Sequence, residues 1–216
     1  MRGKRARNAE PLQSAYVIYE RGDLMLKVKL GAVPLVYPIP IVLVGSNVNG
    51  RANFAQVGDC AVMGIDPALV TVSLSAAHHT TSGIDECRAF SINLPSTQML
   101  SRTDYCGIVS GKDVDKSQLF TTFEGGQTGV PMIQECPVGL ECRVQEIVQI
   151  KHRRIFIAEV LECYVSEQFV ETVDGNPRID DLSKLDPIIY ALDNRYYRIG
   201  SAIGIGYREG ICHQDG

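Results

Sequence analysis

Side chains that could bind an anion gather just before the middle of the chain. Residues 69–74 form a strand-like apolar run, and a short helix over residues 80–88 is expected after it. Backbone N–H groups at a helix start attract phosphate, and hydroxyl and imidazole groups supply further donors. The stretch therefore indicates a phosphate site. Its candidate ligands are Ser73, Ser75, His78, His79, Thr80, Thr81 and Ser82.

The same residues also fit a plainer interpretation. Serine and threonine are preferred at helix N-caps, so Thr81 or Ser82 could simply cap the helix. The residue types alone therefore leave two alternatives open, an anion site or an ordinary connection between a strand and a helix.

A second candidate segment follows a hairpin signal. Asn49-Gly50 is the dipeptide that two-residue hairpin turns favour. The returning strand carries Asn53, Phe54, Ala55 and Gln56. Backbone N–H groups beside amide and apolar side chains suit a flat ring edged with carbonyl groups. An asparagine near a turn is also ordinary turn chemistry, so this segment does not decide the matter alone.

The seven cysteines show no C-x-x-C spacing, and several lie inside apolar patterns. They are interpreted as reduced thiols, as in a cytoplasmic protein. Cys106 lies in a loop-like stretch, where it could be a redox-active thiol or a structural residue. The structural interpretation is preferred because no partner cysteine or adjacent base is apparent. The four histidines show no ligand spacing, so no metal site is expected.

The composition argues against several classes of partner. A formal net charge of -4 gives no general attraction to nucleic acid or to an anionic membrane. The longest apolar stretches, such as residues 39–44, are too short to span a bilayer, and no apolar signal-peptide core follows the basic start. We therefore expect a cytoplasmic protein with no nucleic-acid or membrane partner.

Many short strands separated by Gly and Pro turns predict a mainly β fold. The expected architecture is an antiparallel, Greek-key barrel with short peripheral helices. Besides the strand at 69–75, we expect strands at 15–19, 24–30, 41–46, 52–57, 90–94, 140–145, 155–165, 188–192 and 195–199. A second helix is expected at 96–102, a loop at 104–116 and a helical turn at 115–120.

The strand expected at 155–165 is apolar on both faces, with Phe156 and Ala158 on one and Ile157 and Leu161 on the other. A barrel strand of this kind needs a cover on its outer face, and a second subunit is the expected cover. The chain is expected to divide into an N-terminal extension, 1–26, a single domain, 27–200, and a C-terminal tail, 201–216.

The order of several motifs carries further information. The first motif is Pro38-Ile39-Pro40-Ile41-Val42-Leu43-Val44-Gly45, which leads into the strand expected at 41–46, and the second is Asn53-Phe54-Ala55-Gln56. Next come Asp66-Pro67-Ala68-Leu69-Val70-Thr71-Val72-Ser73-Leu74 and Phe90-Ser91-Ile92-Asn93. Thr103-Asp104-Tyr105-Cys106-Gly107-Ile108-Val109-Ser110-Gly111 then precedes Asp115-Lys116. Over residues 29–200 this series resembles the flavin reductase-like family, also called the flavoredoxin family, which binds FMN in a split β-barrel.

The resemblance implies an FMN-binding split barrel that forms a homodimer. It implies that Asn53, Phe54, Ala55 and Gln56 line the flavin ring. Ser73, Leu74 and Ser75 would bridge the ring and the ribityl chain. His79 and Thr80, with His78 beside them, would hold the phosphate. Asn93 would support the pocket, and Cys106 would lie near the flavin.

Two departures from the family pattern concern charge. Ser75 is followed by two alanines where the family often has a basic residue nearby. Asp59 stands where an apolar or aromatic residue is common. Phosphate binding is therefore expected to depend more on His78, His79 and the helix end.

The resemblance leaves three functions open. An NAD(P)H:FMN oxidoreductase would take hydride from a nicotinamide at an open flavin face. A flavoredoxin-type carrier would hold FMN tightly and exchange electrons with a redox protein partner, without oxidising NAD(P)H itself. An FMN-binding protein with no redox activity is the third alternative. No side chain is assigned a catalytic role, because the cofactor carries the electron-transfer chemistry.

Overall fold

The computed structural model describes Lys27, residues 29–179 and residues 181–211. The strand expected at 15–19 and most of that at 24–30 lie outside these residues. The chain divides into two units, Met1–Val36 and Tyr37–Gly216. The described residues of the first unit are exposed and form neither strand nor helix. The strands and helices described here all belong to the second unit.

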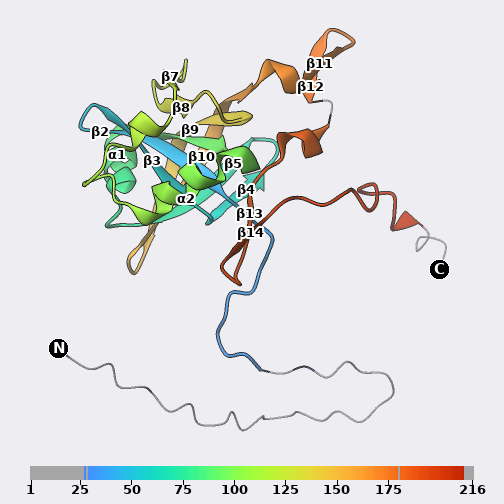
Figure 1. Cartoon of the computed structure of the whole chain (residues 1–216), viewed down its shortest axis with the longest axis horizontal. Coiled ribbons are helices and arrows are strands. Elements are labelled where there is room, and N and C mark those ends of the chain that lie inside the picture. Colours follow the sequence, from blue (N-terminus) through green and yellow to red (C-terminus); the bar gives the residue numbers. More distant parts are fainter. Residues whose placement is uncertain (1–26, 28, 180, 212–216) are drawn as a thin grey trace. The chain divides into compact units, whose positions relative to one another are not determined.

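Seven strands form one antiparallel sheet in the order β3-β2-β6-β9-β10-β5-β4 (Figure 1). Their bounds are β2 Val42–Val48, β3 Arg51–Val57, β4 Cys60–Gly64, β5 Leu69–Ser75, β6 Ala89–Leu94, β9 Val138–Ile150 and β10 Arg153–Val165. Strands distant in sequence lie side by side, as β10 does between β9 and β5. The expected mainly β, antiparallel architecture is confirmed.

The smaller elements surround this sheet. The α-helices are α1, His79–Cys87, and α2, Leu100–Ile108. A three-stranded sheet joins β1, Ile39–Pro40, to the hairpin of β13, Ile189–Ala191, and β14, Arg195–Tyr197. Two further hairpins are β7, Thr122–Glu124, with β8, Pro131–Ile133, and β11, Val170–Val173, with β12, Asn176–Ile179. Short 3₁₀ helices are η1, Thr97–Met99, η2, Lys116–Leu119, η3, Glu167–Phe169, and η4, Leu182–Leu185.

The hairpin of β2 and β3 forms where the sequence predicts it. Asn49 and Gly50 both have positive φ angles, 51° and 75°, as the favoured two-residue turn requires. The turn fixes the register, which pairs Gly45 with Phe54 and Leu43 with Gln56. Successive residues of β3 therefore face opposite sides of the sheet.

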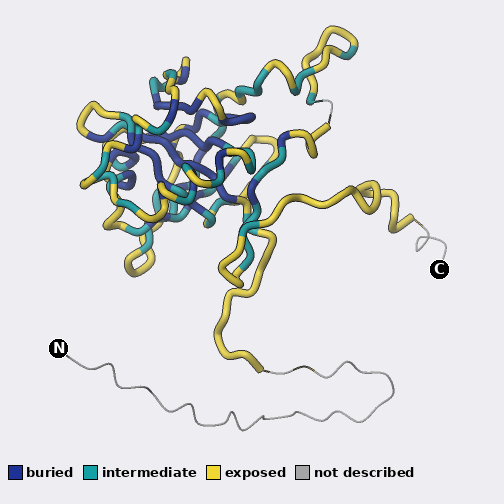
Figure 2. Tube along the Cα trace, viewed as in Figure 1, coloured by how far each residue is buried: buried dark blue, intermediate teal, exposed yellow. Residues whose placement is uncertain are grey.

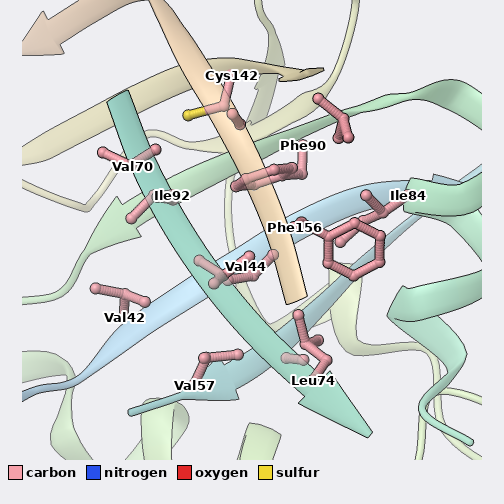
Figure 3. Packing of buried hydrophobic residues seen from close by; sticks show 14 residues of the cluster. Val42, Val44, Val57, Val70, Leu74, Ile84, Phe90, Ile92, Cys142 and Phe156 are labelled. Carbon is pink, nitrogen blue, oxygen red and sulfur yellow. The ribbon is translucent and has the colours of Figure 1, made fainter. Parts of the chain in front are cut away.

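The inner face of the sheet encloses the main core. Alternate residues of β2, β3, β5, β6, β9 and β10 contribute to it, and Ile84 of α1 joins them. Figure 3 shows Val44, Phe90 and Phe156 pointing into this core. Phe90 and Phe156 are fully buried, with ring centroids 6.4 Å apart. Burial of such rings is worth several kcal/mol, of order 1.5–3 for each side chain.

A second core lies on the other face of β2 and β3, under α2. Leu43 and Phe54 meet Met99, Cys106 and Phe120 there. The Phe54 and Phe120 rings pack edge to face, 5.6 Å apart. β3 therefore contributes side chains to both cores. Figure 2 shows that the barrel strands are largely buried, whereas the segment that follows β14 is exposed.

Two local expectations were wrong. The N-cap of α1 is His78, and the Thr81 and Ser82 hydroxyls instead donate to the carbonyls of Ser75 and His79. The residues expected to form a loop from 104 onward are helical as far as Ile108. Tertiary packing overrides the local signal here, because Thr103 and Cys106 are buried on the face of α2 that meets the barrel.

Candidate functional site

The connection from β5 to α1 forms one wall of the candidate site. His78 is extended, with φ -66° and ψ 140°, and no side chain caps the helix N-terminus. The Thr81 hydroxyl donates to the Ser75 carbonyl at 2.8 Å, which fixes the turn. A nine-residue helix therefore begins beside His78 and His79, with an N-terminus that favours negative charge.

Two adjoining cavities lie at this helix N-terminus. The first, about 240 Å³, is lined by Ala55, Gln56, Ala77, His78, His79, Thr80, the backbone stretch 106–111 and Lys116. The second, about 570 Å³, is lined by residues 48, 49 and 51–53, His79 and the stretch 111–116. His79, Gly111 and Lys116 line both. The two cavities therefore adjoin each other, and together they make up the hollow between β3, α1 and the loop after α2.

Two glycines let α2 and its following loop come close to β3. A Cβ at Gly107 would lie 2.0 Å from Oε1 of Gln56, and one at Gly111 would lie 2.0 Å from Oδ1 of Asn53. The Asn53 Nδ2 in turn donates to the Thr80 hydroxyl at 2.7 Å, joining β3 to α1. A side chain at 107 or 111 would therefore displace these amides from the positions that they hold in the cavity walls.

Lys116 is a site residue that the sequence analysis did not single out. It is buried, and its Nζ donates to the Cys106 carbonyl at 2.7 Å. Burial lowers the pKa of Lys116 from its ordinary value. A desolvated cation at the boundary of both cavities is a strong attraction for an anionic or carbonyl-rich ligand.

Arg153 is a second cation that local sequence did not reveal. From β10 it donates to the Ser73 hydroxyl at 3.0 Å and to the Ser73 carbonyl at 2.7 Å, and it pairs with Asp59. Burial lowers the pKa of His78, and the charges of Arg153 and Lys116 lower it further. Arg153 thus brings to Ser73, from 80 positions further along the chain, a positive charge that the residues after Ser75 lack.

The structure brings together part of the expected site. Ala55, Gln56, His78, His79, Thr80 and Cys106 line the first cavity, and Asn53 lines the second. Ser75 lies at the start of the same connection and accepts a bond from the Ala77 N–H. Three of the four residues expected at the flavin ring, Asn53, Ala55 and Gln56, therefore line the two cavities.

The remaining candidates lie elsewhere among the described residues. Phe54 and Leu74 are fully packed in the two cores, and Ser73 is bound by Arg153. Asn93 is buried in the sheet, where it donates to the Leu43 carbonyl and accepts from the Ile133 N–H. Its role in this structure is to join β2, β6 and β8.

A model of the family described as the flavin reductase like domain matches residues 35–197. This span is well over half of the chain. The chain belongs to the flavin reductase like domain family. The family expected from the motif order is thereby confirmed, and flavin-dependent electron transfer is the general class of function that membership supports.

Solved structures agree with this family assignment. Flavoredoxin from Methanosarcina acetivorans is 37% identical with a TM-score of 0.80, over 87% of this chain and 98% of that one. Flavoredoxin of Desulfovibrio vulgaris (Miyazaki F) is 34% identical with a TM-score of 0.75, over 85% and 99%. An uncharacterized protein of Archaeoglobus fulgidus is 29% identical over 147 residues, 67% of this chain and 81% of its own. The fold is the flavin reductase-like split barrel.

Within the described residues, no helix of this flavin reductase-like chain has the length and apolar character needed to cross a membrane.

The reactivity of Cys106 tests whether it is a structural or a redox thiol. Burial raises the pKa of Cys106 to about 11, and the Lys116 charge offsets this only in part. About one thiol in a thousand is then ionised at pH 8. We expect iodoacetamide at pH 8 to modify the exposed Cys87 and to spare Cys106 in the folded protein, as measured by peptide mass mapping.

The control is the same protein in concentrated urea, where both thiols should react. Modification of Cys106 at the Cys87 rate in the folded protein would show that it is an accessible, activated thiol instead.

Proposed function

We propose that this protein binds FMN in the joined cavities and transfers electrons through it. The observation that carries the proposal is the pair of adjoining cavities, both lined by His79, Gly111 and Lys116, in a chain that belongs to the flavin reductase like domain family. The similarity to two flavoredoxins above 30% identity adds support. When bound, FMN supplies hydride or single-electron transfer, and the protein supplies position and electrostatics.

The residues present suit both ends of this cofactor. The flavin ring is flat and carbonyl-edged, and Ala55, Gln56 and Lys116 offer an apolar surface, an amide and a cation. The phosphate is a dianion, and the N-terminus of α1, His79 and the Arg51 side chain offer donors with positive charge. These residues would orient the cofactor in the two cavities.

Retention and reduction of flavin form the first test. FMN-loaded, desalted protein is expected to keep a flavin absorption band under anaerobic conditions. Bleaching of that band by NADH or NADPH would identify an NAD(P)H:FMN oxidoreductase. Bleaching by dithionite but by neither nicotinamide would argue against NAD(P)H oxidation and support a carrier for a redox protein partner. The absence of any FMN binding, at up to millimolar FMN, would overturn the proposal.

The pH dependence of FMN binding should depend on His78. Its pKa in the free protein lies below the usual value because of burial and the charges of Arg153 and Lys116. A bound phosphate would offset those charges and raise this pKa, so binding takes up a proton. Protonated His78 therefore strengthens FMN binding fully at pH values below its pKa in the free protein. This contribution is lost as the pH rises through the higher pKa that His78 has in the complex.

We therefore expect His78→Asn to weaken FMN binding more at pH 5.5 than at pH 8, by roughly 3- to 10-fold. Fluorescence titration of both variants measures the ratio of their dissociation constants. Titration of the phosphate itself affects both variants equally and cancels in that ratio. Riboflavin, which lacks the phosphate, is the control and should show no pH-dependent difference. A pH-independent ratio for FMN would contradict the role of His78.

We further propose that the outer face of β10 is the contact surface of a homodimer. Phe156 and Ala158 face the core, whereas Ile155 and Ile157 lie on the opposite face and outside the core cluster. The neighbouring strand β9 adds the exposed Val148 and Ile150, which pair with Ile155 and Arg153. The hydroxyl of Thr71, opposite Ile157, is buried without a partner among the described residues.

A second copy of this chain is the occupant that this face favours. Arg153 and Glu159 lie on the same face of β10, at opposite sides of Ile155 and Ile157. A two-fold axis through the middle of this apolar patch would therefore bring Arg153 of each protomer toward Glu159 of the other. Such self-complementarity is what an isologous interface requires.

Ile157→Arg should therefore convert a dimer into a monomer, because it places a charge at the centre of the contact. Light scattering after size-exclusion chromatography at about 10 µM would measure the mass. Leu182→Arg, at an exposed apolar residue of η4, is the matched control and should remain dimeric. A monomeric wild-type protein, or a dimeric Ile157→Arg variant, would contradict this interface.

A further inference from the structure

A chain of three polar side chains lies behind the first cavity. Tyr196, on β14, has its hydroxyl between Asp104 of α2 and Gln56 of β3. The Gln56 Nε2 lies 2.9 Å from the Tyr196 hydroxyl, which itself donates a short hydrogen bond to the Asp104 carboxylate. The Tyr196 hydroxyl thus joins three segments of the chain, because Asp104 precedes it by 92 residues and Gln56 by 140 residues.

The direction of these hydrogen bonds follows from the acid. An ionised carboxylate only accepts, so Tyr196 must donate its one proton to Asp104. The phenol oxygen then accepts, and the amide of Gln56 must present its NH₂ group to it. Burial and the bond to Asp104 raise the pKa of Tyr196, so the phenol stays protonated. Asp104 therefore determines, through Tyr196, which way the Gln56 side-chain amide is oriented.

With its NH₂ group held, Gln56 presents its carbonyl oxygen to the cavity. That oxygen lies against the Cα of Gly107, where a Cβ would approach it to 2.0 Å. Gln56 and Gly107 both line the first cavity. Within the described residues, no donor binds Oε1 of Gln56, and this oxygen is not among the buried atoms that lack a partner. It is therefore an acceptor open to a ligand.

We propose that Asp104 and Tyr196 are positioning residues, which fix Gln56 as the acceptor for the imide N3–H of a bound flavin. The pyrimidine edge of the oxidised ring presents two carbonyls that flank this one N–H group. On the oxidised ring, a carbonyl oxygen held toward the cavity can accept only from that N–H group, whereas a flipped amide would donate to the flanking carbonyls. This inference rests on the proposed binding of FMN.

The experiment compares FMN with N3-methyl-FMN, which lacks the imide proton. Loss of one hydrogen bond partner in a site built for it weakens binding, so the wild-type protein should prefer FMN by about tenfold or more. Tyr196→Phe removes the acceptor for the Gln56 amide and frees it to rotate. Its preference for FMN should fall to about twofold.

Asp104→Asn tests the direction of the chain with almost no change in size. An asparagine amide can donate to Tyr196, whose proton is then free to point at Gln56 and reverse its amide. The preference for FMN should fall as it does in Tyr196→Phe. Tyr197→Phe is the matched control, because Tyr197 is the neighbouring tyrosine and bonds the exposed Asp193 instead. It should keep the wild-type preference.

The ratio of the two dissociation constants separates positioning from general damage. A variant that merely loosens the fold weakens both ligands and leaves the ratio unchanged. Rejection of the methyl group by size alone would persist in Tyr196→Phe, and this outcome would overturn the inference. Equal binding of FMN and N3-methyl-FMN by the wild-type protein would overturn it too. No binding of either flavin would instead refute the proposed function itself.

Discussion

The close contact of α2 and its following loop with β3 is the constraint on which the rest of the site depends. Gly107 and Gly111 allow the backbone to reach the Gln56 and Asn53 side chains, and a Cβ at either position would have to displace the facing amide. The same contact buries Phe54 and Cys106 in the second core and turns the chain so that Lys116 points inward. The hollow is therefore a consequence of packing outside the barrel, because the inside is filled by the main core.

The site carries positive charge, although the chain as a whole is negatively charged. The net charge is -4, yet Arg51, Lys116 and Arg153 approach one helix N-terminus from three separate segments. Burial and the charges of Arg153 and Lys116 lower the pKa of His78, and burial lowers the pKa of Lys116 as well. Arg153 is already paired with Asp59, so the buried Lys116 is the cation that a bound anion would offset most.

Local sequence rules and the order of the motifs were sufficient to predict several turns and strands and the family fold. The Asn49-Gly50 turn and the strand at β5 follow from turn chemistry and alternation, whereas the N-cap of α1 lies at His78 and not at the expected Thr81 or Ser82. The family pattern led to the split barrel. Local rules could not show that Arg153 reaches Ser73, because that contact depends on the pairing of β10 with β5. They also missed the burial of Cys106, since the second core assembles from segments on both sides of the loop.

The state of Cys106 bears on which group in the cavity can carry electrons. A cation near a thiol usually favours the thiolate, yet the Nζ of Lys116 is bound to the Cys106 carbonyl. Burial dominates, and the pKa of Cys106 rises to about 11. Cys136 and Cys142, buried in the two cores, also have pKa values raised by burial. A cavity whose one lining thiol stays protonated needs a bound group for electron transfer, and the polar, cation-edged hollow suits a flavin better than it suits thiol chemistry.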